Sequence, residues 1–133
     1  MSELHHLTGL QIAFLRVLWQ RGEASVAEIG EALRPERALA QTTVATVLSR
    51  LEKRGVVAHR REARQFVYRA AVTEGDVRQS MVRELTEGLF QGDVAELVSH
   101  LLSVREIGSD DLARVKQMVE AHEKGTEVSR DKR

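Results

Sequence analysis

The sequence contains no cysteine and a single proline, and aromatic residues make up only 4% of its 133 residues. The absence of cysteine excludes disulfides, thiolate metal sites and cysteine nucleophiles. Because aromatic side chains are scarce, the core must be built from Leu, Val, Ile and Ala. That composition favours helices packed on helices over a β-sandwich, and the presence of only one proline agrees with it.

Long apolar runs are also missing, since no stretch approaches the roughly 18 residues that a membrane span requires. The first residues, Met-Ser-Glu, show no basic segment followed by an apolar one, as a secretory signal would. We therefore expect a cytoplasmic protein that does not insert into membranes.

The formal net charge is zero, but the charge is distributed unevenly along the chain. Residues 1–72 carry 11 Lys/Arg against 7 Asp/Glu, a net of +4, whereas residues 73–133 carry 9 against 13, a net of −4. Within residues 37–69 the excess reaches 8 basic against 2 acidic residues. A basic segment of this kind can bind nucleic acid, although uneven surface charge alone would look the same.

Two short helices are predicted at the start of the chain. Thr8 with Gln11, and Ser25 with Glu28, each form a capping-box pattern ahead of apolar residues at helical spacing. The second helix must end before Pro35. Two short helices with a tight connection are typical of the first pair in a helix-turn-helix protein.

A third helix is predicted over residues 41–54 and ends at Gly55. Its inward face is apolar at positions i, i+3, i+4 and i+7, namely Val44, Val47, Leu48 and Leu51. The remaining face is rich in hydroxyl and basic groups, which is unusual because threonine is a mediocre helix former. Hydroxyl groups can bind phosphates or base edges, and arginine can bind guanine through two hydrogen bonds. The predicted DNA-binding residues of this helix are Gln41, Thr42, Thr43, Thr46, Ser49, Arg50, Lys53 and Arg54.

After Gly55 the apolar period changes from 3.6 to 2, which predicts two strands over residues 56–61 and 65–69. The turn between them, residues 62–64, contains no glycine. Phe66 and Tyr68 should share the face that packs on the helices. Arginines gather near the tip of this hairpin, which makes it a basic wing, and we expect Arg60, Arg61 and Arg64 to contact DNA.

Three amphipathic helices are predicted after residue 72, and residues 125–133 should form a disordered tail. Helices of this size bury little apolar surface alone, so pairing of two copies would supply the missing core. The fold class is thus mostly α with a small β-hairpin: a winged helix-turn-helix over residues 1–72, then a three-helix dimerisation region over 73–124. The predicted dimerisation residues are Met81, Leu85, Leu89, Leu97, Val98, Leu101, Leu102, Leu112, Val115 and Val119.

These features favour a homodimeric repressor that places the helix over 41–54 of each copy in successive major grooves of a palindromic duplex, about 34 Å apart. Three alternatives remain open. The C-terminal helices could fold back on a monomer, the winged helix could serve as a protein-interaction module, or an apolar cavity could bind a small effector.

An enzyme is not expected. No glycine-rich phosphate loop or nucleophile motif is present, and no cofactor is implied. Apart from the adjacent His5 and His6, the histidines have no metal-ligand spacing, so no metal site is predicted.

The sequence resembles the penicillinase-repressor and methicillin-resistance-repressor family of bacterial winged-helix repressors. The resemblance is carried by residues 18–22, the Thr-Thr-Val-Ala-Thr-Val-Leu-Ser-Arg-Leu-Glu-Lys-Arg-Gly run of 42–55, and residues 64–68; it extends more weakly to about residue 124. It implies that Thr43, Thr46 and Arg50 face DNA. The chain departs from the family pattern in a wing without glycine and in Ala70, where a proline often stands.

The resemblance also implies a helical half that dimerises. In several family members, cleavage within the second C-terminal helix relieves repression after a membrane-bound sensor metalloprotease detects a β-lactam. The cleaved bond there is typically Asn-Phe, and the corresponding bond here joins His100 and Leu101. Copper-responsive relatives carry a C-terminal cysteine pair, so the lack of cysteine excludes copper sensing by that route.

Overall fold

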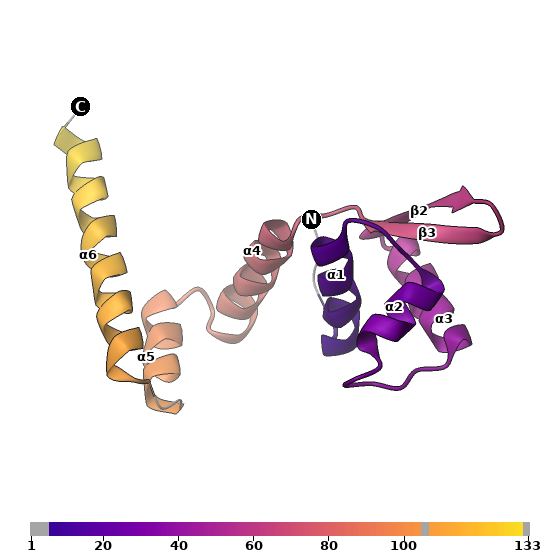
Figure 1. Cartoon of the computed structure of the whole chain (residues 1–133). Coiled ribbons are helices and arrows are strands. Elements are labelled where there is room, and N and C mark those ends of the chain that lie inside the picture. Colours follow the sequence, from indigo (N-terminus) through magenta and orange to yellow (C-terminus); the bar gives the residue numbers. More distant parts are fainter. Residues whose placement is uncertain (1–5, 105–106, 132–133) are drawn as a thin grey trace. The chain divides into compact units, whose positions relative to one another are not determined.

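The computed structural model describes residues 6–104 and 107–131 of the chain. The chain divides into two units, Met1–Gln91 and Gly92–Arg133, which are described separately. The order of elements (Figure 1) is α1 (Gly9–Arg21), β1 (Ala24–Ser25), α2 (Val26–Leu33), α3 (Gln41–Lys53), β2 (Val57–Glu62), β3 (Gln65–Ala70), α4 (Glu74–Glu84), the π-helix η2 (Leu85–Leu89), α5 (Val94–Val104) and α6 (Ser109–Asp131). The predicted fold class, mostly helical with a small β-sheet, is confirmed.

Both predicted capping boxes are present. The Thr8 hydroxyl accepts a hydrogen bond from the backbone N–H of Gln11, whose side chain accepts from the Thr8 N–H. Ser25 and Glu28 do the same at the start of α2. Each box satisfies two backbone donors that a helix N-terminus leaves free, which explains why α1 and α2 begin where they do.

Replacing Ser25 with alanine is expected to lower the free energy of unfolding by about 1 kcal/mol, because the hydroxyl that caps α2 is lost from a buried site. Chemical denaturation of both proteins measures this difference. Ser99→Ala, on an exposed position of α5, is the matched control and should change the unfolding free energy little. An equal loss in both variants would contradict the capping role.

The same box should make stability depend on pH. Hydrogen bonds from the backbone and side chain of Ser25 hold the pKa of Glu28 below its usual value. A carboxyl group whose pKa is lowered by folding stabilises the fold above its unfolded-state pKa, and that contribution is lost as the pH falls through the folded-state value. The contribution of Glu28 is therefore present at neutral pH and disappears in acid.

The two ends of helix α3 are determined mainly by backbone conformation, and the sequence predicts their positions only approximately. Ala40 precedes the helix in an extended conformation and has no side-chain oxygen with which to cap it. The helix ends at Lys53, one residue before the predicted end, with Arg54 as its C-cap. Gly55 then adopts a φ of +81°, which favours glycine and turns the chain into β2.

Within the described residues, the sheet has three antiparallel strands in the order β1-β3-β2, so the predicted hairpin gains a third strand. Ala24 and Ser25 pair with Tyr68 and Val67 of β3. A two-residue strand is too short to show a period of 2, which is why the sequence does not reveal it. The hairpin is also tighter than predicted, because Glu62 pairs with Gln65 and the turn consists of residues 63 and 64.

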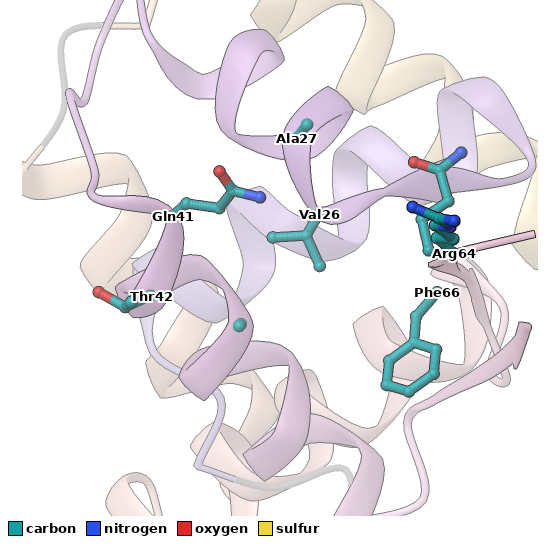
Figure 2. Close-up of a pocket in the computed structure, with 8 residues that line it drawn as sticks. Val26, Ala27, Gln41, Thr42, Arg64 and Phe66 are labelled. Atoms are coloured by element: carbon teal, nitrogen blue, oxygen red, sulfur yellow. The ribbon is translucent and has the colours of Figure 1, made fainter.

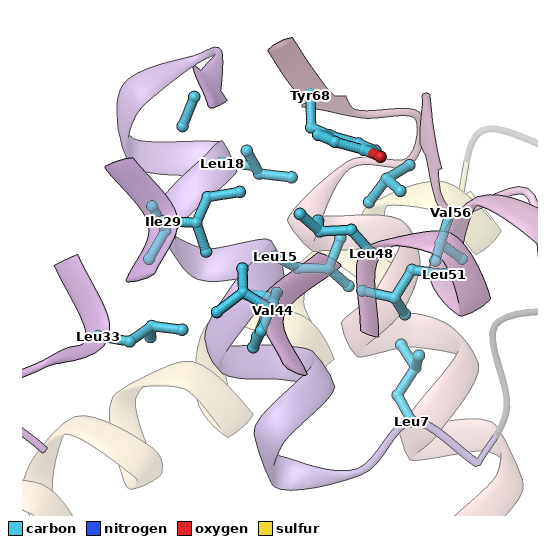
Figure 3. Packing of buried hydrophobic residues seen from close by; sticks show 14 of the residues in the cluster. Leu7, Leu15, Leu18, Ile29, Leu33, Val44, Leu48, Leu51, Val56 and Tyr68 are labelled. Carbon is cyan, nitrogen blue, oxygen red and sulfur yellow. The ribbon is translucent and has the colours of Figure 1, made fainter. Parts of the chain in front are cut away.

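The core of the first unit lies between α1, α2, α3 and the sheet (Figure 3). Leucine and valine side chains fill most of it, as the composition predicts. The indole N–H of Trp19 donates to the carbonyl oxygen of Val72 over 2.9 Å, which ties α1 to the chain that leaves β3. The fully buried side chains are Phe14, Leu15, Leu18, Ile29, Val44, Leu48, Leu51, Val56 and Val57.

One aromatic side chain does not follow the prediction. Tyr68 is buried, but Phe66, two residues earlier on the same face of β3, is 42% exposed. The strand extends past the helices towards the hairpin turn, so only its inner part reaches the core. The predicted packing of both rings on the helices therefore holds for Tyr68 alone.

The first predicted C-terminal helix is present as α4 continued by η2. The Thr73 hydroxyl accepts a hydrogen bond from the backbone N–H of Asp76, as its position predicts. Gln91 and Gly92 both have positive φ angles and end this segment. Because Val77 is buried in the core and Met81 packs against that core, α4 belongs to the first unit. The boundary between the two units therefore lies after Gln91 and not after residue 72.

The disordered tail predicted over 125–133 differs from the structure, in which α6 continues to Asp131. Adding a residue to an existing helix is easier than starting one, and no proline follows Gly125 to stop the helix. Residues 132 and 133 lie outside the described part.

Candidate nucleic-acid interface

The exposed face of α3 carries the residues that the sequence predicts to bind DNA. The helix is held by Val44, Leu48 and Leu51, which are fully buried. Packing of this apolar stripe turns the other face outward, as the helical period requires. The residues exposed on that face are Gln41, Thr42, Thr43, Thr46, Ser49, Arg50 and Lys53.

Thr46 uses its hydroxyl hydrogen within the helix. The hydroxyl donates to the backbone carbonyl oxygen of Thr42 over 2.9 Å. A hydroxyl group has one hydrogen and two lone pairs. In this conformation Thr46 therefore offers an acceptor and a methyl group to a ligand, rather than a donor.

Arg54 is placed differently from the other predicted contacts. Its side chain is half-buried, and its Nη1 lies 3.5 Å from Oε1 of Gln11 on α1. Arg54 is also the C-cap of α3, where a cation is favourable beside the free carbonyl groups. The structure thus brings Arg54 to the junction of α3 and α1 and separates it from the outward face.

Arg60 of the wing is engaged in an ion pair that the sequence does not reveal. Its Nε and Nη2 donate to the two carboxylate oxygens of Glu23 over 2.9 and 3.0 Å. Glu62 lies 3.4 Å from the same guanidinium. The hydrogen bonds from Arg60 lower the pKa of Glu23, and Glu23 in turn raises the pKa of Arg60. This pair fastens the wing to the segment before β1.

Arg61 and Arg64, the other two wing arginines that the sequence predicts to contact DNA, are exposed, as Arg60 is. The Arg61 guanidinium lies 5.8 Å from the centre of the Phe66 ring, within the range of a cation–π contact. Arg64 occupies the hairpin turn beside Ala63, whose φ is +55°. A positive φ is unusual for alanine, and Ala63 adopts it because this wing has no glycine in its turn.

A groove of about 450 Å³ separates α3 from the wing. Figure 2 shows Val26 of α2, Gln41 of α3 and Phe66 of β3 around it. Its described lining includes one arginine and no carboxylate, so the groove is open to an anionic ligand with an apolar side. Of its eight lining residues the sequence predicts only Gln41, Thr42 and Arg64 to bind DNA, since alanine and valine carry no binding signal. The lining residues are Val26, Ala27, Gln41, Thr42, Ala45, Arg64, Gln65 and Phe66.

The apolar residues predicted to dimerise are mostly exposed. In the first unit Leu89 is 69% exposed, whereas Met81 packs on the core. In the second unit Leu97 is half-buried. Contiguous exposed apolar surface on a folded chain usually marks an interaction site. The predicted residues that are exposed are Leu85, Leu89, Val98, Leu101, Leu102, Leu112, Val115 and Val119, and Val82, Val94 and Met118 are exposed with them.

His100 and Leu101, the residues that flank the corresponding cleavage position, are exposed on α5. His5 lies outside the described residues, and His6 Nδ1 lies 3.0 Å from Oε1 of Glu84. Across the part of the chain that the structure describes, no three His, Asp or Glu residues are grouped as a metal site would require. None of the described helices combines the length and apolar character needed to cross a membrane.

Comparisons with known proteins agree with this geometry. The sequence profile of the penicillinase repressor family matches residues 7–121. The penicillinase repressor of Bacillus licheniformis is 21% identical over 122 residues, which cover 92% of this chain and 95% of that protein. The transcriptional regulator BlaI of Mycobacterium tuberculosis (strain CDC 1551 / Oshkosh) is 34% identical over 128 residues, covering 94% and 91%. Among solved structures, the DNA binding domain of the repressor BlaI superposes with a TM-score of 0.50 at 26% identity, covering 57% of this chain and 93% of that domain.

Proposed function

This chain belongs to the penicillinase repressor family, and from that membership we propose that it represses transcription by binding a palindromic DNA operator as a homodimer. The family consists of DNA-binding transcriptional repressors with a winged-helix fold, not of enzymes. The operator symmetry, the dimer and the mode of release are the parts that we propose here.

The observation that carries the proposal is the outward face of α3. Its hydroxyl groups, with Arg50 and Lys53, form a surface that suits the major groove, because each can meet a phosphate or a base edge. Arg61 and Arg64 on the wing would contact the adjacent backbone. We assign Arg54 and Arg60 a supporting role, because Gln11 and Glu23 hold them within the fold.

The exposed apolar faces of α5 and α6 support the homodimer. Two copies that bury these faces against each other would form a core that the second unit of one copy lacks. A two-fold dimer presents two α3 helices to two half-sites related by the same symmetry, which is why we propose a palindromic operator. Because a repressor of bacterial genes must reach the chromosome, the protein would act in the cytoplasm.

A fluorescence-anisotropy titration tests the proposed function. The full-length protein is titrated against the duplex upstream of its own gene and against a scrambled duplex, each at two salt concentrations. We expect tighter binding to the upstream duplex, and affinities that fall as salt rises, because each contacted phosphate releases counterions. Equal, weak binding to both duplexes and to a library of genomic fragments would contradict an operator-binding role and favour a protein-interaction module.

For the mode of release we propose cleavage of the His100–Leu101 bond by a membrane-bound sensor metalloprotease, with β-lactam response genes as the regulated set. Both residues are exposed, but the bond lies within α5. A protease binds an extended backbone, so this part of α5 must unwind before cleavage. Incubation of the protein with membranes from β-lactam-treated cells, followed by mass spectrometry of the fragments, would reveal the cleaved bond; an intact chain would exclude this route.

A further inference from the structure

Glu52 occupies an unfavourable position for a DNA-binding protein. It is the only carboxylate of α3, and it lies in the last turn of that helix. The free carbonyl groups at a helix C-terminus already give that end a partial negative charge, so a carboxylate there is repelled. A negative charge beside the DNA-facing surface would also repel phosphates. Because both the helix end and the nearby DNA-facing surface disfavour this carboxylate, Glu52 needs a partner side chain that stabilises it.

His59 of β2 is that partner. Its Nδ1 lies 2.7 Å from Oε1 and 2.8 Å from Oε2 of Glu52. The two side chains are 32% and 34% exposed, so neither is fully hydrated. In the tautomer with its proton on Nδ1, the ring donates a hydrogen bond to the carboxylate at these distances.

The same imidazole ring also contacts the second strand of the wing. Its centre lies 4.4 Å from that of Phe66 and 5.3 Å from that of Tyr68, with the rings tilted by 38° and 44°. These are ordinary distances for packed aromatic rings. Burial raises the pKa of Tyr68, and the nearby charge of Glu52 raises it further. One side chain thus joins the last turn of α3 to both β2 and β3.

We propose that the Glu52–His59 pair positions the wing for operator binding by fixing its angle to α3 and by giving the carboxylate of Glu52 a hydrogen-bond donor. His59 acts through Glu52 and the wing rather than by touching DNA. The Arg60–Glu23 pair fastens the same wing to the segment before β1. These two contacts attach the hairpin to two different elements, so together they restrict its orientation more than either contact alone. The inference rests on the proposed function, because it concerns the surface that would bind the operator.

A double-mutant cycle in the full-length protein tests the pair. His59→Leu keeps an apolar side chain against Phe66 and Tyr68 but leaves Glu52 without its donor. We expect this change to weaken operator binding by about 5- to 10-fold, within the coupling measured for contacting residues. In the Glu52→Gln background the same change should cost less than about 2-fold, because the unpaired charge is gone.

His59→Gln provides a conservative rescue, because its amide can still donate a hydrogen bond to Glu52. We expect it to bind the operator more tightly than His59→Leu. The Glu74–Arg78 pair of α4, 3.1 Å apart, is the matched control. A cycle of Glu74→Gln and Arg78→Leu should show no coupling in operator affinity, because that pair lies outside α3 and the wing.

The outcomes separate the possible roles of His59. If His59→Leu costs the same factor in the wild-type and in the Glu52→Gln background, the histidine acts independently of the pair and the proposal is wrong. Unchanged affinity in His59→Leu would overturn it equally. Circular dichroism of every variant shows whether it is folded, and if His59→Leu is not, His59→Ala takes its place in the same cycle with the same expected result. Failure of the wild-type chain to prefer its operator would instead overturn the proposed function.

Discussion

A full-length variant that carries Leu101→Glu and Val115→Glu is expected to be monomeric and to bind a palindromic operator about 100-fold more weakly than the wild-type chain. Both side chains are exposed apolar groups, one on α5 and one on α6. Each glutamate would place a charge in the surface that we propose to be buried between two copies. An unpaired charge is strongly disfavoured in such an interface.

The loss of affinity follows from the geometry of two half-sites. Once one α3 of a dimer is bound, the second is held near its own half-site, so its binding is effectively intramolecular. A monomer loses this advantage although its DNA-contacting residues are unchanged. The variant should therefore retain the monomer's affinity for a single half-site while losing preference for the palindrome.

Sedimentation velocity gives the oligomeric state, and anisotropy with full and half operators gives both affinities. A double variant that carries Ser99→Glu and Ser103→Glu is the matched control, because it adds the same two charges at exposed positions on the polar side of α5. This control should remain dimeric. If the variant with Leu101→Glu and Val115→Glu stayed dimeric, or if it bound the palindrome as tightly as wild type, the proposed interface would be wrong.

Replacing Arg50 with alanine is expected to weaken operator binding by about 10- to 100-fold and to reduce the preference for operator over scrambled DNA. Arg50 is exposed on α3, near the middle of the outward face. A guanidinium at this position can bind a guanine through two hydrogen bonds, which a shorter side chain cannot do. The fold should be unaffected, because the buried face of α3 does not include this residue.

Anisotropy titrations with both duplexes at several salt concentrations measure the effect. Arg16→Ala, an exposed arginine on α1, serves as the control for the loss of one positive charge. A uniform loss of affinity for both duplexes, with a salt slope smaller by about one, would show that Arg50 contacts a phosphate rather than a base. Wild-type affinity in Arg50→Ala would remove Arg50 from the proposed interface.

The order and type of most elements follow from the sequence alone, because their causes are local. The two capping boxes depend on residues three apart, and the apolar stripe of α3 depends on the helical period. Gly55 marks the change from helix to strand because the chain there needs a positive φ. The outward face of α3 could be predicted for the same reason, since burying one side of a helix exposes the other.

Contacts between residues far apart in the sequence could not be predicted from local sequence patterns. The strand β1 exists only because β3 lies beside it, and two residues carry no detectable period. The charge of Arg60 indicated a phosphate contact, yet Glu23, 37 positions away in the sequence, holds its guanidinium. Gln11 similarly draws Arg54 towards α1. Composition shows how many charges a segment has, but not which of them are already paired.

The sequence by itself therefore determined the winged helix, the outward face of α3 and the apolar faces of the C-terminal helices, because each depends on spacing within one element. Only the tertiary structure decided that Arg60 pairs with Glu23, how far Phe66 extends beyond the core, and that Glu52 meets His59. Those facts depend on side chains from different elements meeting in space. Ion pairs and ring contacts require distances of a few ångströms. Those distances depend on how the elements pack together, and the spacing of residues along the sequence does not determine them.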